Sequence, residues 1–206
     1  MKRKKIFSLL LCLAMTLLAF AGCTSDVAPE NSESADAKVT ESAVKDGEEW
    51  TYDTPMVIGF SQNKLAHPFR VAGVEQLEAY VKELGLNWEI VVTDGNNDAT
   101  KQTADIEDLI SQEVDAIICC PVTADTMATA ATTVTNAGIP LILVNRNVSN
   151  DDYTCAITGS NYQIGQKTAE DMAERLGGEG KVAMIQGTLG ATDTTDRATG
   201  FMETIA

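Results

Sequence analysis

The stretch DAIICCPVTADTMATAATTVTNAGIPLILVN, residues 115–145, predicts the fold. It begins with an apolar strand over 115–120, continues as an Ala/Thr-rich helix over 123–137 that Gly138 ends, and closes with a second apolar strand over 140–145. Both strands are continuously apolar, a pattern typical of parallel strands that are covered on both faces. The stretch is therefore expected to form one strand–helix–strand unit of a parallel α/β sheet.

The same unit repeats toward the N-terminus. Strands are expected over 56–60 and 88–93, and helices over 68–84 and 99–113. The four strands begin near residues 57, 88, 115 and 140, so their spacing is close to the roughly 30 residues of a βαβ unit. This regular alternation predicts a doubly wound, parallel α/β sheet.

The repeat breaks after the fourth strand, where a polar segment leads into a further strand without a helix between them. The elements expected there are a strand over 153–158, a helix over 161–176, a strand over 180–186 and a helix from about Thr194. A strand that joins without its helix is what a crossover between two lobes would produce. We therefore expect an N-terminal α/β lobe over 53–158 and the start of a C-terminal α/β lobe over 159–206. Since the last helix reaches Ala206 without a capping signal, the second lobe is expected to be truncated.

Residues 1–22 predict a signal peptide. A basic start, Lys2–Lys5, precedes an apolar run over 6–21 that is shorter than the roughly 20 residues an untilted membrane helix needs. Small residues directly before Cys23 resemble the signal of bacterial lipoproteins, although Phe20 stands where leucine is usual. Cys23 is accordingly expected to carry a lipid at the mature N-terminus. An ordinary secretory signal with a chance cysteine is the alternative.

Residues 23–52 are expected to form a flexible, lipid-anchored tether. The segment is polar and acidic and has almost no large apolar side chains. It cannot bury enough surface to offset the entropy cost of ordering it. We expect it to hold the folded part outside a bacterial cell membrane, at the cell surface or in the periplasm, with the lipid as the only contact with the membrane.

The composition argues against several classes of function. The chain carries 30 Asp and Glu against 15 Lys and Arg, and its net charge of −15 does not suit a nucleic-acid binder. Five cysteines are too few for a disulfide scaffold, and one histidine leaves little room for metal sites or catalytic triads. No phosphate-binding loop, dinucleotide fingerprint, paired carboxylates or nucleophile elbow follows a strand. We therefore expect no metal, no cofactor and no enzymatic activity.

Polar side chains gather after the predicted strands, at the edge where open parallel sheets bind ligands. They are amides, guanidinium groups, an aromatic ring and one imidazole. This set suits a neutral polyol, because amides and guanidinium groups hydrogen-bond hydroxyl groups and a ring can lie against the C–H face of a sugar. The positions are 61–70, Asp94, Asn97, 119–121, 145–147, 186–188, Asp196 and Arg197.

Several of these segments resemble the ribose/galactose-type periplasmic sugar-binding proteins, the substrate-binding components of ABC sugar importers. The segments are IGFS (58–61) with HPF (67–69), DGNND (94–98), AIICCP (116–121), GIPLILVNR (138–146), and GSN (159–161) with Gly165. They are specific jointly and weak singly, and they keep the family's order over about 56–206. The resemblance implies the type I periplasmic-binding-protein fold, with two similar α/β lobes joined by a hinge and a sugar held between them.

The resemblance also implies roles for single residues. Phe69 matches the aromatic residue that stacks on the sugar ring, and His67 matches a polar residue that bonds a hydroxyl group. Asn145 and Arg146 match an acid-or-amide plus arginine pair that holds hydroxyl groups and the ring oxygen. Arg197 matches an arginine of the second lobe.

Three positions depart from the family pattern and argue against ribose itself. Arg70 stands where ribose binders have a second aromatic residue, Cys120 stands where a polar side chain often lines the cleft, and Asn145 replaces an aspartate. Each candidate also has a structural alternative. These alternatives are a core role for Phe69, a solvated loop for His67, a turn for Asn145, a carboxylate partner for Arg146, an ordinary helix surface for Arg197 and plain strand packing for Cys120.

Two functions fit this interpretation of the sequence. The first is the monomeric, lipid-anchored substrate-binding component of an ABC importer, which captures a pentose, hexose or related polyol by hinge closure and delivers it to a membrane permease. The second is an extracellular receptor of the same fold for a signal or chemotactic ligand, such as a furanosyl quorum signal. The effector domain of a lactose-repressor-type protein is disfavoured, because it needs an N-terminal DNA-binding helix-turn-helix where this chain has an export signal.

Overall fold

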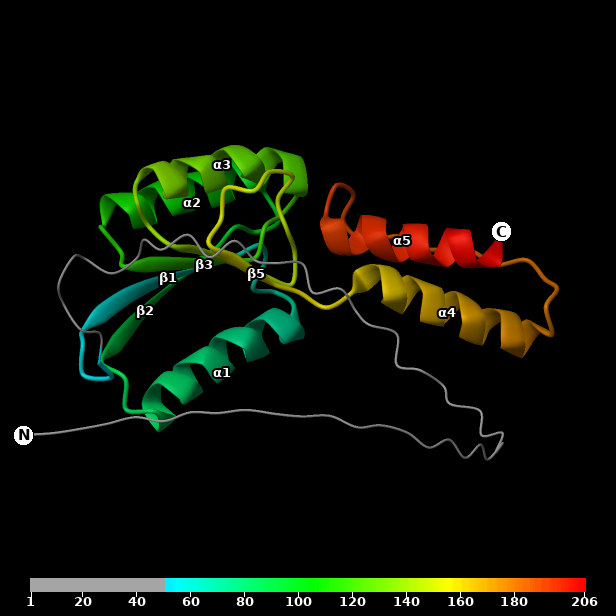
Figure 1. Cartoon of the computed structure of the whole chain (residues 1–206), viewed down its shortest axis with the longest axis horizontal. Helices are drawn as coiled ribbons and strands as arrows, with labels where there is room; N and C mark the ends of the chain where they lie inside the picture. Colours follow the sequence, from blue (N-terminus) through cyan, green and yellow to red (C-terminus); the bar gives the residue numbers. More distant parts are fainter. Residues whose placement is uncertain (1–50) are drawn as a thin grey trace, which may run out of the picture. The chain divides into compact units, whose positions relative to one another are not determined.

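The computed structural model describes residues 51–206, so the predicted signal peptide, the lipidation of Cys23 and almost all of the tether lie outside the described residues. Within this part, five parallel strands form one sheet in the order β2-β1-β3-β4-β5 (Figure 1). The strands are β1 Met56–Gln62, β2 Trp88–Asp94, β3 Ala116–Cys119, β4 Leu141–Val144 and β5 Cys155–Ile157. The helices are α1 Pro68–Glu83, α2 Ala99–Ser111, α3 Ala124–Asn136, α4 Asn161–Leu176 and α5 Thr192–Ile205.

The sheet is wound in both directions from β1, as the strand spacing predicts. The chain moves outward from β1 to β2 and then returns past β1 to β3, β4 and β5. Since each parallel crossover is right-handed, this reversal puts α1 on one face of the sheet and α2 and α3 on the other, as Figure 1 shows. The predicted α/β sheet is confirmed. Each strand and helix begins and ends within two residues of the limits predicted for it.

The main hydrophobic core lies between the sheet and the pair α2 and α3. Its side chains belong to elements far apart in the sequence. Those that are at most 2% exposed include Ile106, Leu109, Ile117, Met127, Val134, Leu141 and Leu143. Burying one such side chain contributes about 1.5–3 kcal/mol. Gly59 in the middle of β1 lets α2 approach closely, because a Cβ there would lie 2.8 Å from Leu109 Cδ1.

The parallel pairing aligns the carboxyl ends of neighbouring strands. β1 pairs with β2 as far as Gln62 and Asp94, and with β3 as far as Ser61 and Cys119. The segments that follow these strands therefore meet at one edge of the sheet, which is where the sequence places the polar candidates.

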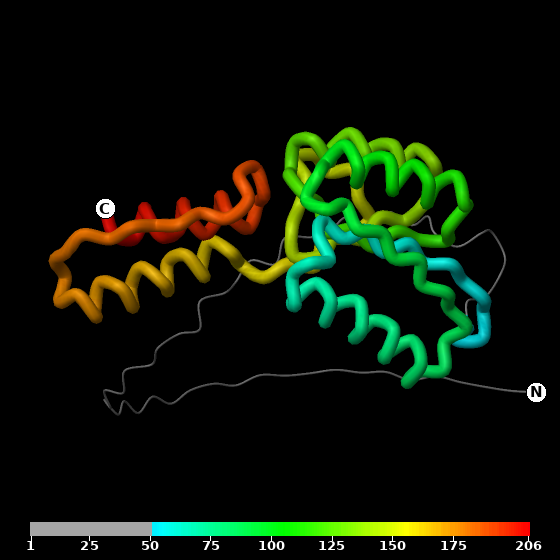
Figure 2. Tube along the Cα trace, turned by 180° about the vertical axis from the view of Figure 1, so that it is seen from behind, coloured from blue at the N-terminus to red at the C-terminus, as the bar shows by residue number. Residues whose placement is uncertain are grey.

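Helices α4 and α5 lie side by side in Figures 1 and 2. Two glycines permit this contact, because a Cβ on Gly165 or on Gly200 would collide with backbone atoms of the other helix. Helix α4 ends at Gly177, whose φ of 68° is left-handed and suits glycine. None of the helices in residues 51–206 combines the length and the apolar character that a membrane span requires.

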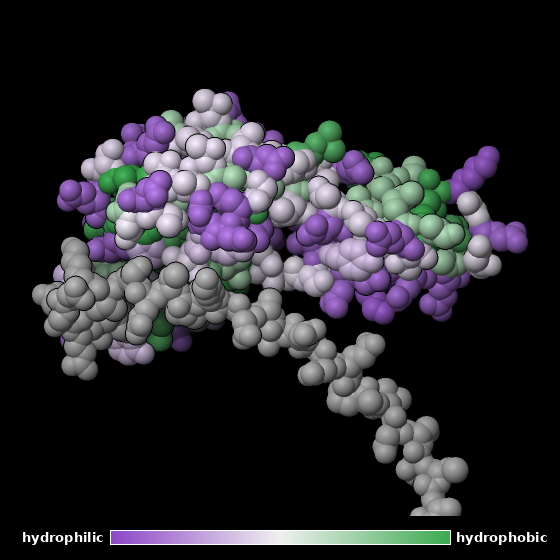
Figure 3. Space-filling view, turned by 45° about the horizontal axis from the view of Figure 1, so that its top comes forward, coloured by the Kyte–Doolittle hydropathy of each residue, from purple (hydrophilic) through white to green (hydrophobic). Residues whose placement is uncertain are grey.

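The strand predicted over 180–186 is wrong. The segment forms no regular element, and Ile185 within it is 98% exposed. A strand is stable only when a neighbour takes up its N–H and C=O groups, and no segment in the described part of the chain pairs with this one. Hydrophobic side chains of this segment are consequently exposed, among them Val182 and Met184. Figure 3 shows hydrophobic surface on the α4–α5 part of the chain.

Candidate ligand-binding site

A cleft of about 570 Å³ lies between α1 and the carboxyl ends of β1, β4 and β5. Three of the seven predicted ligand residues line it, namely Phe69, Arg70 and Asn145. Apolar side chains of the sheet form much of the remaining wall, including Phe60, Ile118 and Val144. The cleft therefore combines an apolar wall with a few polar groups, which is usual for small-molecule sites.

The first turn of α1 positions two of these residues. His67 caps the helix, since its Nδ1 accepts a hydrogen bond from Phe69 N at 3.2 Å, and Pro68 suits the first helical position. The ring of Phe69 is 62% exposed, and the guanidinium carbon of Arg70 lies 5.3 Å from the ring centroid. An exposed aromatic face and a cation thus stand together at the cleft. His67 does not line the cleft itself.

Arg70 is buried although its guanidinium group makes no hydrogen bond or ion pair with any described residue. Its exposed fraction is 8%. Burial is the largest influence on the pKa of Arg70 and lowers it, while Cys120 raises it, Arg146 lowers it and Asp193 raises it.

Arg146 connects three segments of the chain. Its Nη1 donates hydrogen bonds to the carbonyl oxygens of Pro121 and Val122 at 3.3 and 3.0 Å. Its Nε lies 3.0 Å from Asp193 Oδ1, and both side chains are nearly buried. The neighbouring Asn145 has a φ of 65°, a left-handed conformation that asparagine tolerates better than most residues. Arg146 thereby holds the end of β3 to the start of α5 and does not line the cleft.

Cys120 lies behind the cleft and is fully buried. Burial raises the pKa of its thiol to about 11, although Arg70 and Arg146 lower it, Asp193 raises it and a hydrogen bond with Asn145 lowers it. Burial likewise raises the pKa of Cys119. Both thiols are therefore neutral at physiological pH, which agrees with packing in the strand rather than with a reactive role.

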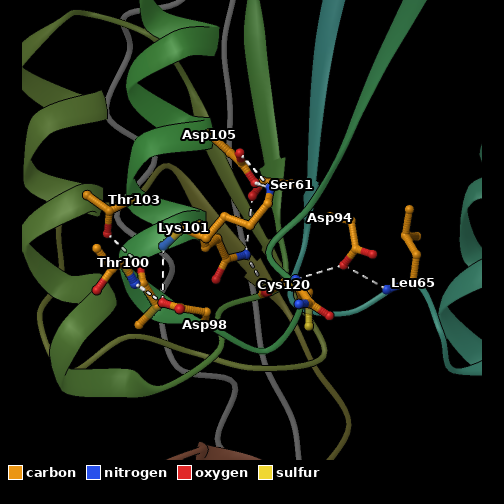
Figure 4. A network of polar contacts seen from close by, with 12 residues as sticks. Ser61, Leu65, Asp94, Asp98, Thr100, Lys101, Thr103, Asp105 and Cys120 are labelled. Atoms are coloured by element: carbon orange, nitrogen blue, oxygen red, sulfur yellow. Dashed lines mark hydrogen bonds and ion pairs between the residues drawn. The ribbon is translucent and has the colours of Figure 1, made fainter.

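A buried glutamine ties the strand ends together. Gln102 Nε2 donates to Ser61 Oγ at 3.2 Å and to the Cys120 carbonyl oxygen at 3.0 Å, and its Oε1 accepts from Val122 N at 2.9 Å. Nearby, Asp94 Oδ1 accepts from Leu65 N at 3.0 Å, so it shapes the loop that leads to α1 (Figure 4). These contacts make Gln102 and Asp94 structural supports of the cleft.

Arg197, the candidate from the last helix, lies apart from the cleft lining. Its Nε donates to Asn161 Oδ1 at 3.0 Å, which joins α5 to α4. Within residues 51–206, no group of three or more His, Cys, Asp or Glu side chains could hold a metal ion. A second hollow of about 560 Å³ lies along α4, and its lining residues all belong to this one helix and its N-cap, within 160–171.

The structure gives roles to three residues that were not among the predicted ligand residues. Gln62 lines the cleft, and its place at the end of β1 put it among the strand-end positions, although no signal separated it from its neighbours. Asp193 pairs with Arg146, but it is one of 30 acidic residues and nothing in its sequence context marks it. Thr192 supports the same junction, because its Oγ1 accepts a hydrogen bond from Asn147 N at 3.0 Å.

Comparisons with known proteins agree with this geometry. A family model described as "Periplasmic binding protein domain" matches residues 58–206. The ribose import binding protein of Bacillus subtilis is 33% identical over 144 residues, which cover 70% of this chain and 47% of that protein.

Two solved structures are also similar. An ABC transporter solute binding protein from Bacillus halodurans with bound myo-inositol is 31% identical, with a TM-score of 0.69 over 75% of this chain and 54% of the other. The fructose binding periplasmic domain of a hybrid two component system is 27% identical, with a TM-score of 0.70 over 73% and 49% of the two chains. The chain thus spans about half the length of the proteins it matches.

Proposed function

The chain belongs to the periplasmic binding protein family and has its type I α/β fold, and on this premise we propose that it is the substrate-binding component of an ABC importer for a sugar or related polyol. The sugar enters the cleft beside α1 and is held there while the second lobe closes over it. The loaded protein then delivers it to a membrane permease. The chain itself performs no catalysis.

The observation that carries this proposal is the pairing of Phe69 and Arg70 at the mouth of the cleft. The exposed ring of Phe69 offers a flat apolar face to the C–H side of a sugar, and the guanidinium group beside it offers hydrogen-bond donors to the hydroxyl groups. Asn145 lines the same cleft and supplies both a donor and an acceptor. His67 donates through Nε2, because its Nδ1 is already an acceptor for Phe69 N.

We propose that Arg146 and Cys120 act at the inner wall of the site. Arg197 acts from the second lobe, which closes over the sugar. Among the described residues, none accepts a hydrogen bond from Arg146 Nη2, and we propose that this nitrogen reaches the sugar once the site closes. The family pattern has a carboxylate at position 145, where this chain has an asparagine. Asp193, which lies 3.0 Å from Arg146, supplies a carboxylate next to that position.

The N-terminal features complete the proposal. We propose that residues 1–22 direct export, that Cys23 carries the lipid and that residues 23–52 tether a monomeric receptor to the outer side of the cell membrane. The support is the basic and apolar start of the chain followed by a polar, acidic segment.

A sensory receptor for a sugar-like signal is the second candidate. It is favoured by the similarity to the fructose binding periplasmic domain of a hybrid two component system, which shares the fold at 27% identity. Deleting the gene separates the two roles. An importer component is required for growth on the bound sugar, whereas a receptor is required only for the response to it.

A thermal-shift screen of the full-length gene product tests sugar binding. The compounds are D-ribose, L-arabinose, D-galactose, D-fructose, xylitol, myo-inositol and glycerol. A compound that binds only the native state adds about 2.7 kcal/mol at a hundredfold excess over its dissociation constant, which is a shift of several degrees.

We expect Phe69→Ala to abolish the shift. Arg146→Ala should abolish it as well, and it should also lower the ligand-free midpoint because the buried Asp193 loses its partner. Arg175→Ala should retain it, because Arg175 is an exposed residue of α4 that pairs with Asp171 and does not line the cleft. A folded wild-type protein that shifts with none of the seven compounds would refute the proposed function.

A further inference from the structure

Gln62 is a buried side chain whose amide oxygen has no partner among the described residues. It is the last residue of β1 and is 2% exposed. Its Oε1 is enclosed and accepts no hydrogen bond from any residue in the described part of the chain. Leaving a buried primary amide unsatisfied is costly, so natural proteins keep such groups mainly where a ligand or a function requires them.

Gln102 provides the contrast, because it is the same side chain at similar burial. It is 0% exposed, and both ends of its amide are satisfied by Ser61, Cys120 and Val122. The amide of Gln102 therefore stabilises the fold, whereas the Oε1 of Gln62 has no partner among the described residues.

Gln62 lies in the lining of the cleft, close to Arg70. Its side chain lines the cleft together with Arg70, whose guanidinium group is also buried and also without a hydrogen bond in residues 51–206. A Cβ built on Gly73 would lie 3.9 Å from Gln62 Nε2, so the amide packs beside the first turns of α1. Arg70 and Gly73 are three residues apart on this helix and share a face. The two unsatisfied polar groups are thus neighbours in one cleft.

We propose that Gln62 is a ligand-binding residue that works together with Arg70, an inference that rests on the proposed sugar-binding function. The amide of Gln62 accepts a hydrogen bond from one hydroxyl group of the ligand, and Arg70 donates to the oxygen of an adjacent one. An acceptor and a fork of donors side by side match the two hydroxyl groups of a vicinal diol. The ligand class is therefore a sugar or polyol with a free vicinal diol at this end.

The test compares Gln62→Met with Gln102→Met in the full-length gene product. Methionine keeps the length and shape of glutamine but removes the amide. We expect Gln62→Met to leave the midpoint of the ligand-free protein unchanged or higher, and to weaken binding of whichever of the seven screened compounds binds wild type by at least tenfold. We expect Gln102→Met to lower the ligand-free midpoint. Gln62→Glu, which keeps an acceptor oxygen beside Arg70, should retain more affinity than Gln62→Met.

The outcomes separate this inference from the function it rests on. Binding to wild type that survives in Gln62→Met would overturn the inference alone, as would a ligand-free midpoint for Gln62→Met that falls as far as that of Gln102→Met. If none of the seven compounds binds wild type, the proposed function fails and the inference falls with it.

Discussion

The contact between α4 and α5 depends on Gly200, and replacing this glycine with alanine should destabilise the protein. A Cβ on Gly200 would lie 2.1 Å from the carbonyl oxygen of Tyr162 and 3.2 Å from Gln166 N. Both atoms belong to the backbone of α4, so neither can rotate away. Gly165 faces the same contact from the other side, with its Cβ position 2.2 Å from the carbonyl oxygen of Arg197.

The size of the effect follows from these distances. Ordinary carbon contacts lie at about 3.5–4.0 Å, so the helices would have to separate by on the order of 1 Å. Overpacking of this kind costs about 1–3 kcal/mol, and the backbone contact puts Gly200→Ala at the upper end. The higher helix propensity of alanine offsets about 1 kcal/mol. We expect a net loss of about 2 kcal/mol in the free energy of unfolding. The separation should also weaken the hydrogen bond between Arg197 Nε and Asn161 Oδ1.

Urea unfolding of the full-length gene product measures this loss, and Gly73→Ala is the matched control. Gly73 also lies within a helix, but its nearest atom to a new Cβ is the side-chain nitrogen of Gln62 at 3.9 Å, which is an ordinary contact. The control should therefore gain up to about 1 kcal/mol from helix propensity. If Gly200→Ala is as stable as wild type, the close packing of α4 against α5 is refuted.

Three further perturbations test the site. His67→Ala should cost about 1 kcal/mol of stability in urea unfolding because the cap of α1 is lost, and His67→Asn should restore it; equal stability of all three proteins would contradict the cap. Asp193→Ala leaves the buried Arg146 without its carboxylate and should cost about 3–5 kcal/mol, whereas the exposed Asp196→Ala should change stability by less than about 0.5 kcal/mol. Burial raises the pKa of Cys120 to about 11, so between about pH 9 and pH 11 the unfolded state releases this proton while the folded state keeps it. Stability should therefore fall as the pH rises through this range, and the fall should be smaller in Cys120→Ala.

The secondary structure could be predicted because its determinants are local. Continuous apolar runs mark the strands, and helix ends carry their own signals, such as Asp98 and Ser160 at N-caps and Gly177 at a C-terminus. The segment over 180–186 is the exception, because its apolar character is strand-like and yet a strand forms only with a partner. Pairing is a non-local property that no short window of sequence contains.

The candidate site was predictable only in outline. The rule that parallel sheets bind ligands beyond the carboxyl ends of their strands placed Phe69, Arg70 and Asn145 near one another, and the structure brings these three into one cleft. The same rule could not separate Cys120, which follows β3, and Arg146, which follows β4, although both side chains are buried and neither lines the cleft.

The sequence by itself determined the five strands and five helices of the described residues and the positions where polar groups follow the strands, because each depends on neighbours within a few residues. The tertiary structure alone decided which of two glutamine side chains is hydrogen-bonded within the fold and which lines the cleft. Gln102 reaches partners 41, 18 and 20 residues away in the chain, whereas Gln62 Oε1 meets none in the described part and the side chain lines the cleft. Such partnerships depend on how the strands pair and the helices pack, and only the folded chain brings the groups within hydrogen-bond distance.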